Sequence, residues 1–401
     1  MEETARLLQG GLSHVGPVFA KSLSAIDTRE ARTNQSGIYF PNTVARELFG
    51  LKCERGFNEE KPIAIHWIQS GDITSSKAKY YGAKKNESRI TGEIYTPGLI
   101  ERGDTGSLFV FWRVEDSDYA ALVIKEEDNI NLFLEEYGLT PSDLGRIVVG
   151  KARHEQTVDE AIHKYLDIIE ESGVPFPGSR EVSAAARLCR GLKHSSIISS
   201  PDSALLSWTN AEYGVFRGLE ELYYGRQIRK TFVSVDDFVS LALSITNRRK
   251  SRAGHSFENQ LEALFEEFGL SFETQVTTES KKRPDFLFPG AAAYFESEFP
   301  TQGLTVLAAK TTCKDRWRQV ITEADRLRDG WKYLCTLQQG VSEMQVAEML
   351  EDQVRLVCPE PYHRFFAKSV RGELWTIRDF IKYTSALEDD YSRCYGVYYR
   401  N

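Results

Sequence analysis

An aspartate and a lysine stand at the ends of two strand-like runs in the last third of the sequence. Asp285 follows a proline and precedes the apolar run 286–288, so the pattern places it at the start of a strand. Lys310 ends the apolar run 304–309, which is typical of a buried strand, and a buried ammonium group is costly unless it is paired or used. Carboxylates that hold a hard divalent cation, with a lysine beside them, suit the hydrolysis of a phosphodiester.

The second carboxylate of such a site is not where the simplest arrangement would put it. Strand alternation places Ala308 on the same face as Lys310, and an acid is expected there. The following segment has apolar residues at helical spacing, namely Trp317, Val320, Ile321, Ala324 and Leu327. Glu323 lies at the edge of this stripe, nearly in register with Arg316 at about 100° per residue. The predicted helix could therefore supply the missing acid from Glu323.

Each of these acids also has a plain structural interpretation. Asp285 after a proline is common in turns. Glu323 could be a surface acid paired with Arg316 or Arg326. Glu258, on the helix predicted after residues 254–256, is a candidate auxiliary acid, although the beginning of a helix favours acids in any case.

Composition indicates a globular protein. The 401 residues are 41% hydrophobic and 27% charged, which allows two domains or one large one. No apolar run approaches the roughly 20 residues that span a bilayer, and the first residues lack the pattern of a signal peptide, so a cytoplasmic protein without a membrane partner is expected. The six cysteines show no zinc spacing and are expected to be reduced thiols.

The formal net charge of −8 argues against a general nucleic-acid coat protein, but basic residues gather locally. Residues 246–256 hold four basic side chains and no acid, and 310–328 hold six against three. In the first window, Arg248, Arg249, Lys250 and Arg252 suit phosphate contacts, or a solvated charged loop. In the second, Lys314, Asp315 and Arg316 suit the reading of base edges, because arginine binds guanine in bidentate fashion and aspartate accepts from cytosine.

The pattern of the chain changes at about residue 151. Before it, short β-branched and aromatic runs between turn residues predict a compact barrel or sandwich. Its polar loops 27–35 and 84–88 are either solvated or contact DNA. A helix predicted over 158–171 is followed by a Pro/Gly-rich break at 173–179, and the longer helical patterns 182–192, 213–222, 235–243 and 257–268 then alternate with strands. We predict a first domain over 1–153, a hinge or linker over 154–179 and an α/β domain over 180–401.

Several long motifs, ordered and correctly spaced, resemble those of the EcoRII-type restriction endonucleases. They are Thr246-Asn247-Arg248-Arg249-Lys250-Ser251-Arg252-Ala253-Gly254, Arg283-Pro284-Asp285-Phe286-Leu287-Phe288-Pro289, Ala293-Tyr294 with Glu298-Phe299-Pro300, and Lys310-Thr311-Thr312-Cys313-Lys314-Asp315-Arg316-Trp317-Arg318-Gln319 with Glu323-Ala324-Asp325. The resemblance is strong over about residues 235–340. It is weaker but collinear in the first domain.

The resemblance implies a C-terminal restriction-endonuclease-like domain with a mixed central sheet flanked by helices, cleaving DNA with Mg²⁺. Its active site has the second acid moved onto the helix, which accounts for Ala308, and by family position Asp285, Lys310 and Glu323 are catalytic, with Asp285 and Glu323 as metal ligands and Tyr294 close by. Lys314, Asp315 and Arg316 are then expected to read the outer C·G pairs of a short CC…GG-type site.

The resemblance further implies a homodimer formed through the C-terminal domain, and an N-terminal B3-like pseudobarrel. That domain binds a second DNA copy as effector and restrains cleavage. Its DNA-binding residues correspond to Asn34, Tyr39, Lys84, Lys85, Asn86, Glu87 and Arg89. Two other interpretations stay open: a non-cleaving DNA-binding regulator, and a nuclease with a modification-dependent or repair role.

Overall fold

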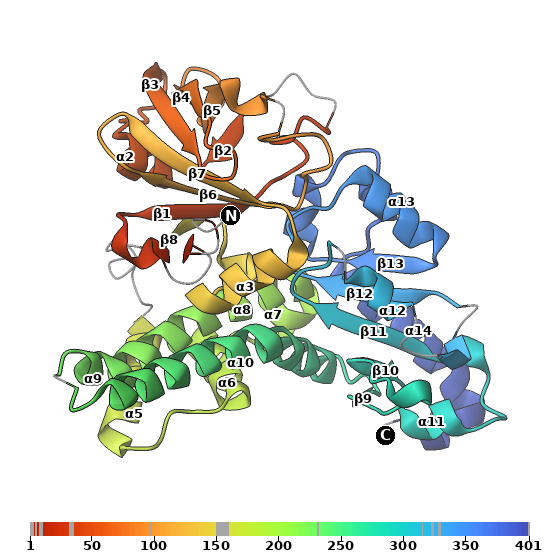
Figure 1. Ribbon diagram of the computed structural model, residues 1–401. Coiled ribbons are helices and arrows are strands. Elements are labelled where there is room, and N and C mark those ends of the chain that lie inside the picture. The colour runs from red at the N-terminus through yellow and green to blue at the C-terminus, as the bar shows by residue number, and fades with distance from the viewer. Residues whose placement is uncertain are drawn as a thin grey trace. The chain divides into compact units, whose positions relative to one another are not determined.

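The computed structural model describes residues 4, 6–7, 11–31, 36–96, 98–149, 160–230, 232–314, 316–321, 325–327 and 330–399. The chain forms two compact units (Figure 1). The first contains Met1–Thr157 together with Gln339–Met344 and Arg364–Ser369. The second contains Val158–Gln338, Gln345–His363 and Val370–Asn401.

The first unit is built on one eight-stranded sheet, as the mainly-β prediction required. Its strands are β1 (Val18–Ser22), β2 (Ile38–Phe40), β3 (Asn58–Trp67), β4 (Ile73–Tyr81), β5 (Ser88–Gly92), β6 (Leu108–Arg113), β7 (Asp118–Ile124) and β8 (Arg146–Val149). The spatial order is β2-β5-β4-β3-β7-β6-β1-β8, and β3–β7 is parallel while the other neighbours are antiparallel. Helices α2 (Asn42–Phe49) and α3 (Glu127–Tyr137) accompany the sheet.

Strand β4 has only a weak hydrophobic pattern for a strand. Its buried positions include Thr74, Ser76 and Ala78, which are small or polar and give no hydrophobic alternation. The sheet is nevertheless well packed, because its core is largely aromatic. Phe40, for example, stacks on Phe19 with the ring centroids 4.4 Å apart.

Two short segments from the C-terminal half of the sequence complete the first unit. Segment Gln339–Met344 and segment Arg364–Ser369 both pack beside the loop that follows β1. The Ala25 amide donates to the Phe365 carbonyl over 3.0 Å, and the Glu343 amide donates to the Glu30 carboxylate over 3.1 Å. The first unit therefore contains chain from both halves of the protein.

The second unit begins with a helical layer, coloured yellow-green to green in Figure 1. Its helices are α5 (Glu160–Ser172), α6 (Ser179–Arg190), α7 (His194–Ser199), α8 (Pro201–Glu220) with a π-helical turn over Glu221–Gly225, α9 (Arg226–Ile228) and α10 (Val235–Glu267). Helix α5 packs against α6 and α8, so half of the segment 154–179 that was predicted as a linker is an ordered helix. The two helices predicted over 235–243 and 257–268 are one helix of 33 residues. Residues 246–256 lie within this helix, so the interpretation of this segment as a charged loop was wrong.

A five-stranded mixed sheet forms the rest of the second unit. Its strands are β9 (Glu273–Thr274), β10 (Phe286–Phe288), β11 (Thr305–Lys310), β12 (Lys332–Thr336) and β13 (Val354–Val357), in the order β13-β12-β11-β10-β9. Strands β13, β12 and β11 are parallel to one another, whereas β10 is antiparallel to its neighbours β11 and β9. The remaining helices are α11 (Ala291–Phe295), α12 (Trp317–Val320), α13 (Glu343–Glu351), which begins in the first unit, and α14 (Ile377–Tyr395). A mixed sheet with helices confirms the predicted α/β architecture.

The helix predicted after Lys310 is shorter than its pattern indicated. Helix α12 ends at Val320, and the chain is described again as a 3-10 turn over Asp325–Leu327. Val320 and Ile321 are β-branched, and such residues lose side-chain freedom in a helix. A continuous helix over 317–327 was therefore wrong, although Trp317, Val320 and Leu327 are buried as predicted.

A buried carboxylate ties three parts of the second unit together. Asp202, near the start of α8, accepts backbone N–H groups from Glu360 (3.0 Å), Ile377 (2.9 Å) and Arg378 (3.3 Å). Burial raises the pKa of the Asp202 carboxyl, while these hydrogen bonds act in the opposite direction.

Asp202→Ala is expected to destabilise the protein by about 2–4 kcal/mol, because it leaves one buried and two partly buried N–H groups without their acceptor. Asp202→Asn is the matched control and should cost less, since its amide oxygen can still accept from Glu360 and Ile377. Urea denaturation of both variants checks this, and equal losses would contradict it.

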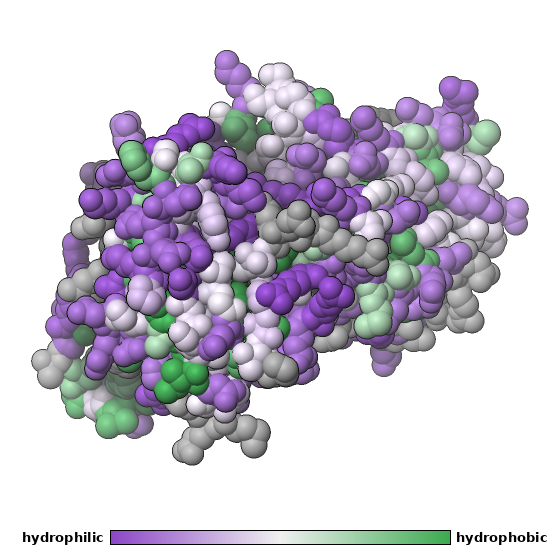
Figure 2. Space-filling model, turned by 90° about the horizontal axis from the view of Figure 1, so that it is seen from above, coloured by the Kyte–Doolittle hydropathy of each residue, from purple (hydrophilic) through white to green (hydrophobic). Residues whose placement is uncertain are grey.

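The described helices include none long and apolar enough to cross a membrane. Figure 2 shows one face of the molecule as mostly hydrophilic, with small separate hydrophobic spots.

Candidate active site

Asp285 and Lys310 meet at the ends of two adjacent antiparallel strands. Asp285 directly precedes β10, Lys310 ends β11, and Phe286 pairs with Leu307. The Lys310 ammonium group lies 2.8 Å from Oδ2 of Asp285, and the Ala309 amide donates to the same oxygen over 2.8 Å. Asp285 is buried and Lys310 is partly exposed. Lys310 is thus paired with a carboxylate, which offsets the free-energy cost of burying its ammonium group.

Glu258 reaches the same site from α10. Burial, and then the negative charge of Asp285, raise the pKa of the Glu258 carboxyl from its ordinary value near 4.5 to about 7, while Lys310 acts in the opposite direction. Each of these two carboxylates disfavours ionisation of the other in a partly buried site. A bound cation would reduce this repulsion. The candidate auxiliary acid therefore lies in the electrostatic environment of the pair.

Gln275 is a member of the site that the sequence did not reveal. Its side-chain amide donates to Oδ1 of Asp285 over 3.1 Å, and its backbone amide donates to the Asp285 carbonyl over 3.3 Å. Gln275 follows the two-residue strand β9 and has a φ of 54°. No motif or periodicity marks it, so only the pairing of β9 with β10 brings it to Asp285.

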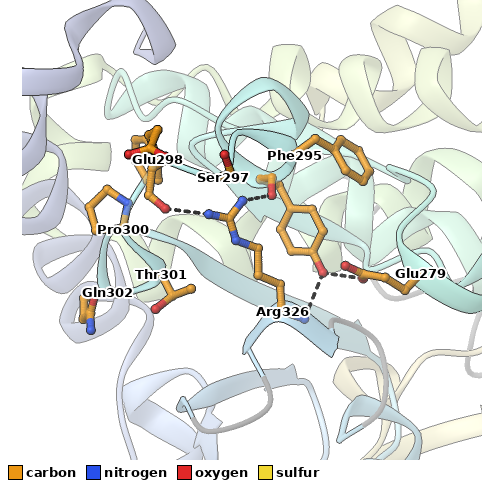
Figure 3. A pocket seen from close by; sticks show the side chains of 10 residues that line it. Glu279, Phe295, Ser297, Glu298, Pro300, Thr301, Gln302 and Arg326 are labelled. Atoms are coloured by element: carbon orange, nitrogen blue, oxygen red, sulfur yellow. Dashed lines mark hydrogen bonds between the residues drawn. The ribbon is translucent and has the colours of Figure 1, made fainter.

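Other predicted site residues lie around this pair. Glu323 and Asp315 fall outside the described residues. Lys314 and Arg316 are half-buried and follow β11, and the Lys314 carbonyl accepts from Gln345 over 2.7 Å. The Tyr294 hydroxyl donates to Glu279 over 2.6 Å (Figure 3). The carboxylates and the lysine are thus brought together, while Tyr294 engages a different acid.

The basic residues of α10 are placed differently from the prediction. Arg252 is buried, with its guanidinium carbon 4.9 Å from the centre of the Tyr213 ring. Arg249 pairs with Glu220 over 2.6 Å, and Arg248 donates to the Tyr224 hydroxyl over 2.6 Å. Lys250 is exposed. Because three of the four side chains are engaged with α8 and the π-helical turn that follows it, Lys250 is the one of these four that the structure presents for a phosphate contact.

In the first unit, the predicted effector residues lie around the turn between β4 and β5. Lys84, Lys85 and Asn86 are exposed, although the Asn86 side chain also accepts from the Tyr80 hydroxyl over 2.7 Å. Glu87 lies 3.3 Å from Arg89, which is buried and donates to the Gly37 carbonyl over 2.9 Å.

Tyr39, on β2, is 38% exposed, and its ring lies 5.9 Å from the Arg89 guanidinium carbon. Asn34 lies outside the described residues. Because the Arg89 side chain is buried, we assign it a structural role. Tyr39 and the β4–β5 turn are exposed, so a ligand can reach them.

Comparison with known proteins identifies the family to which this chain belongs. A family model described as EcoRII C terminal matches residues 216–381, and one for the N-terminal part of restriction endonuclease EcoRII matches residues 14–150. The type II restriction enzyme EcoRII of Escherichia coli is 37% identical over 394 residues, covering 93% of this chain and 95% of that enzyme. The chain belongs to the EcoRII family of type II restriction endonucleases.

The family assignment confirms the resemblance drawn from the motifs and the prediction of an enzyme. A member of the EcoRII family is a site-specific deoxyribonuclease, which removes the alternative of a non-cleaving regulator. The type II restriction enzyme SsoII of Shigella sonnei is 31% identical over 156 residues, covering 37% of this chain and 49% of that enzyme.

Two solved structures are also similar in part. Metal-depleted Ecl18kI, in complex with uncleaved, modified DNA, has a TM-score of 0.46 at 22% identity and covers 59% of this chain and 86% of its own. The B3 domain of the UbaLAI restriction endonuclease, with cognate DNA, has a TM-score of 0.22 at 19% identity and covers 32% and 80%.

Proposed function

We propose that this EcoRII-family enzyme hydrolyses double-stranded DNA at a short CC…GG-type sequence with Mg²⁺ as its metal. The observation that carries the mechanism is the Asp285–Lys310 pair with Glu258 beside it. Glu323 completes the ligand set by family position. Restriction endonuclease homologues typically depend on divalent metal ions, and the carboxylate oxygens of Asp285 and Glu323 are ligands that suit a hard cation.

The donor set fits such a cation. Burial, and next the negative charge of Asp285, raise the pKa of Glu258 although Lys310 opposes this, and a nearby cation would favour the ionised carboxylate. The described residues include no group of three His, Cys, Asp or Glu side chains placed to hold a metal, and the assignment of Glu323 as second ligand rests on its family position. When bound, the metal polarises the phosphate and lowers the pKa of the attacking water.

The protein residues have separate tasks in this mechanism. Asp285 is held in one orientation by Lys310, the Ala309 amide and Gln275. The Lys310 ammonium group offsets the charge that develops on the phosphate or orients the water. Glu258, with a pKa of about 7, accepts or holds a proton near neutral pH.

Discrete cleavage of plasmid DNA tests the proposal. Unmethylated plasmids incubated with Mg²⁺ should give fragments whose ends map to a CC…GG-type sequence, and chelation of the metal should abolish them. Fragments that map to unrelated sequences would overturn the assigned site. Cleavage restricted to methylated or damaged plasmid would favour the modification-dependent or repair alternative.

Arg316→Ala is expected to cost about 1–3 kcal/mol of discrimination at one position of the site, which is the range for one bidentate arginine–guanine pair. Arg318→Ala is a matched control, because Arg318 follows Arg316 by two residues and pairs with Glu348 of α13 over 2.6 Å. Competition between the mapped site and single-base variants measures the change. Unchanged preference in Arg316→Ala would remove this residue from the readout.

We propose that the first unit is an effector domain that binds a second DNA copy at Tyr39 and the β4–β5 turn. We also propose that the active enzyme is a homodimer formed through the C-terminal domain. The chain segments that make up the first unit support a coupling between DNA binding to this unit and cleavage. It includes the segments Gln339–Met344 and Arg364–Ser369, which lie in sequence after β12 and β13. These strands follow β11, which carries Lys310, in the same sheet.

Deletion of residues 1–153, or addition of a short cognate duplex, is expected to raise the rate of cleavage of a one-site substrate by about tenfold or more, a coupling typical of allosteric systems. A duplex of scrambled sequence is the control. Sedimentation of the full chain reports whether it is a dimer. An unchanged rate in both experiments would contradict the effector role.

A further inference from the structure

Within the first unit, Tyr39 and the segment Arg364–Ser369 are bound to the same short stretch of backbone. The Tyr39 amide donates to Oδ1 of Asp27 over 3.0 Å. The Ala25 amide donates to the Phe365 carbonyl over 3.0 Å. Because Ala25 and Asp27 are only two residues apart, their Cα atoms are at most about 7 Å from each other. Residues 39 and 365, which are far apart in the sequence, are therefore close neighbours in this unit.

Asp27 fixes the stretch to which both of them are bound. Its side chain is fully buried, and its Oδ2 accepts from the Lys21 ammonium group over 2.6 Å. The same oxygen accepts from the amide and the hydroxyl of Ser24 over 2.8 Å and 2.7 Å. Hydrogen bonds to an ionised group are among the strong ones in proteins. The backbone beside Tyr39 is thus held in place, and a ligand that binds Tyr39 meets a preformed surface.

The partly exposed ring of Tyr39 has two buried cations beside it. The Lys21 ammonium group lies 5.7 Å and the Arg89 guanidinium carbon 5.9 Å from the centre of the ring. Both side chains are buried, so they add positive potential at this surface although they are not themselves exposed to a ligand. Glu87, a nearby acid, lies 3.3 Å from Arg89, which offsets its charge.

Arg364 adds an exposed cation at the same place. It lies in the 3-10 turn Glu360–Phe365 that follows β13, directly before Phe365, and its guanidinium carbon is 4.8 Å from the centre of the Phe365 ring. Burial raises the pKa of the Tyr39 hydroxyl, and the charge of Arg364 is the largest that acts in the opposite direction, before that of Arg89. The effect of a charge weakens with distance, so Arg364 is close to this hydroxyl.

We infer that Arg364 is a DNA-binding residue of the first unit, where it contacts a backbone phosphate of the duplex bound at Tyr39 and the β4–β5 turn. The inference rests on the proposed effector role of this unit. Arginine and lysine side chains supply most of the affinity for the phosphate backbone, and the turn itself adds the exposed Lys84 and Lys85. A duplex bound at this surface then contacts chain from both halves of the sequence directly.

The test is the binding of the mapped duplex, fluorescently labelled, to the full-length enzyme, followed by anisotropy without divalent metal at several salt concentrations. Tyr39→Ala identifies the part of the binding that belongs to the first unit. Arg364→Ala is expected to weaken that part by about tenfold, as the loss of one charge-assisted hydrogen bond does. The slope of log K against log salt concentration should fall by about 0.9, the value for one phosphate.

Two further variants show whether the effect belongs to this side chain. Arg364→Lys keeps the charge and should keep the salt slope. Lys368→Ala is the matched control, because Lys368 is an exposed cation of the same segment and its loss changes the net charge by the same amount. In the Tyr39→Ala background, Arg364→Ala should have little further effect, because both changes act on one site. All single variants should melt at the wild-type temperature.

The outcomes separate this inference from the proposed effector role. If Tyr39→Ala binds the duplex more weakly while Arg364→Ala keeps the wild-type affinity and salt slope, Arg364 does not contact DNA and the effector site stands. Equal weakening by Arg364→Ala and Lys368→Ala would show a general charge effect and overturn the assigned contact. If Tyr39→Ala and the double variant Lys84→Ala/Lys85→Ala both bind as the wild type does, the effector site is wrong and the assignment of Arg364 falls with it.

Discussion

Replacing Asp285 with asparagine is expected to slow DNA cleavage by at least about 10³-fold, while sequence-specific binding persists. Removing one preorganised charge-stabilising group from an active site costs about 10²–10³-fold, and loss of an anionic metal ligand adds to this. Asparagine has nearly the same shape, and its oxygen can still accept the Ala309 amide that Oδ2 of Asp285 now accepts. The fold should therefore survive, and the loss should lie in the chemical step.

Single-turnover cleavage of a mapped duplex, with binding measured separately in the absence of divalent metal, checks this result. Gln275→Ala is the graded control, because the Gln275 side chain donates to the second carboxylate oxygen of Asp285 and is not itself a proposed metal ligand. It should slow cleavage by about 10–100-fold, as outer-shell partners of metal ligands do. An Asp285→Asn enzyme within tenfold of the wild-type rate would remove Asp285 from the active site.

Glu258→Gln is expected to stabilise the metal-free protein at pH 8 by about 3 kcal/mol and to have little effect at pH 4. Burial and the charge of Asp285 raise the pKa of Glu258 from about 4.5 to about 7. The folded state thus binds this proton more tightly than the unfolded state does. Folding stability should fall as the pH rises from about 4.5 to 7 and stay low above it, at about 1.4 kcal/mol per unit of pKa difference.

Denaturation of the wild type and Glu258→Gln at pH 4, 6 and 8 in a chelator measures this dependence. Asp236→Asn is a control on the same helix, since Asp236 is an exposed acid in the first turn of α10. Saturating Mg²⁺ should remove most of the advantage of Glu258→Gln at pH 8, because the cation relieves the repulsion in the wild type. A stability difference that is the same at all three pH values would contradict the shared acidic site.

Local sequence patterns determined the two strand ends that form the centre of the site. The proline before Asp285 and the apolar run before Lys310 both report backbone conformation over a few residues, and β10 and β11 lie where those patterns put them. The motifs from 246 to 325 also identified the family, because several ordered motifs at fixed spacing seldom arise together by chance.

Only the tertiary structure decided which other side chains join that pair. Glu258 comes from the C-terminal part of a 33-residue helix, and local sequence identified it only as a candidate. Gln275 directly follows a two-residue strand, and no local pattern marks it. Arg252 belongs to a strongly basic run but is buried against Tyr213, because packing of α10 on α8 outweighs the tendency of a charged run to stay in water. Contacts between residues distant in sequence depend on how whole elements pack, and short-range periodicity carries no information about that packing.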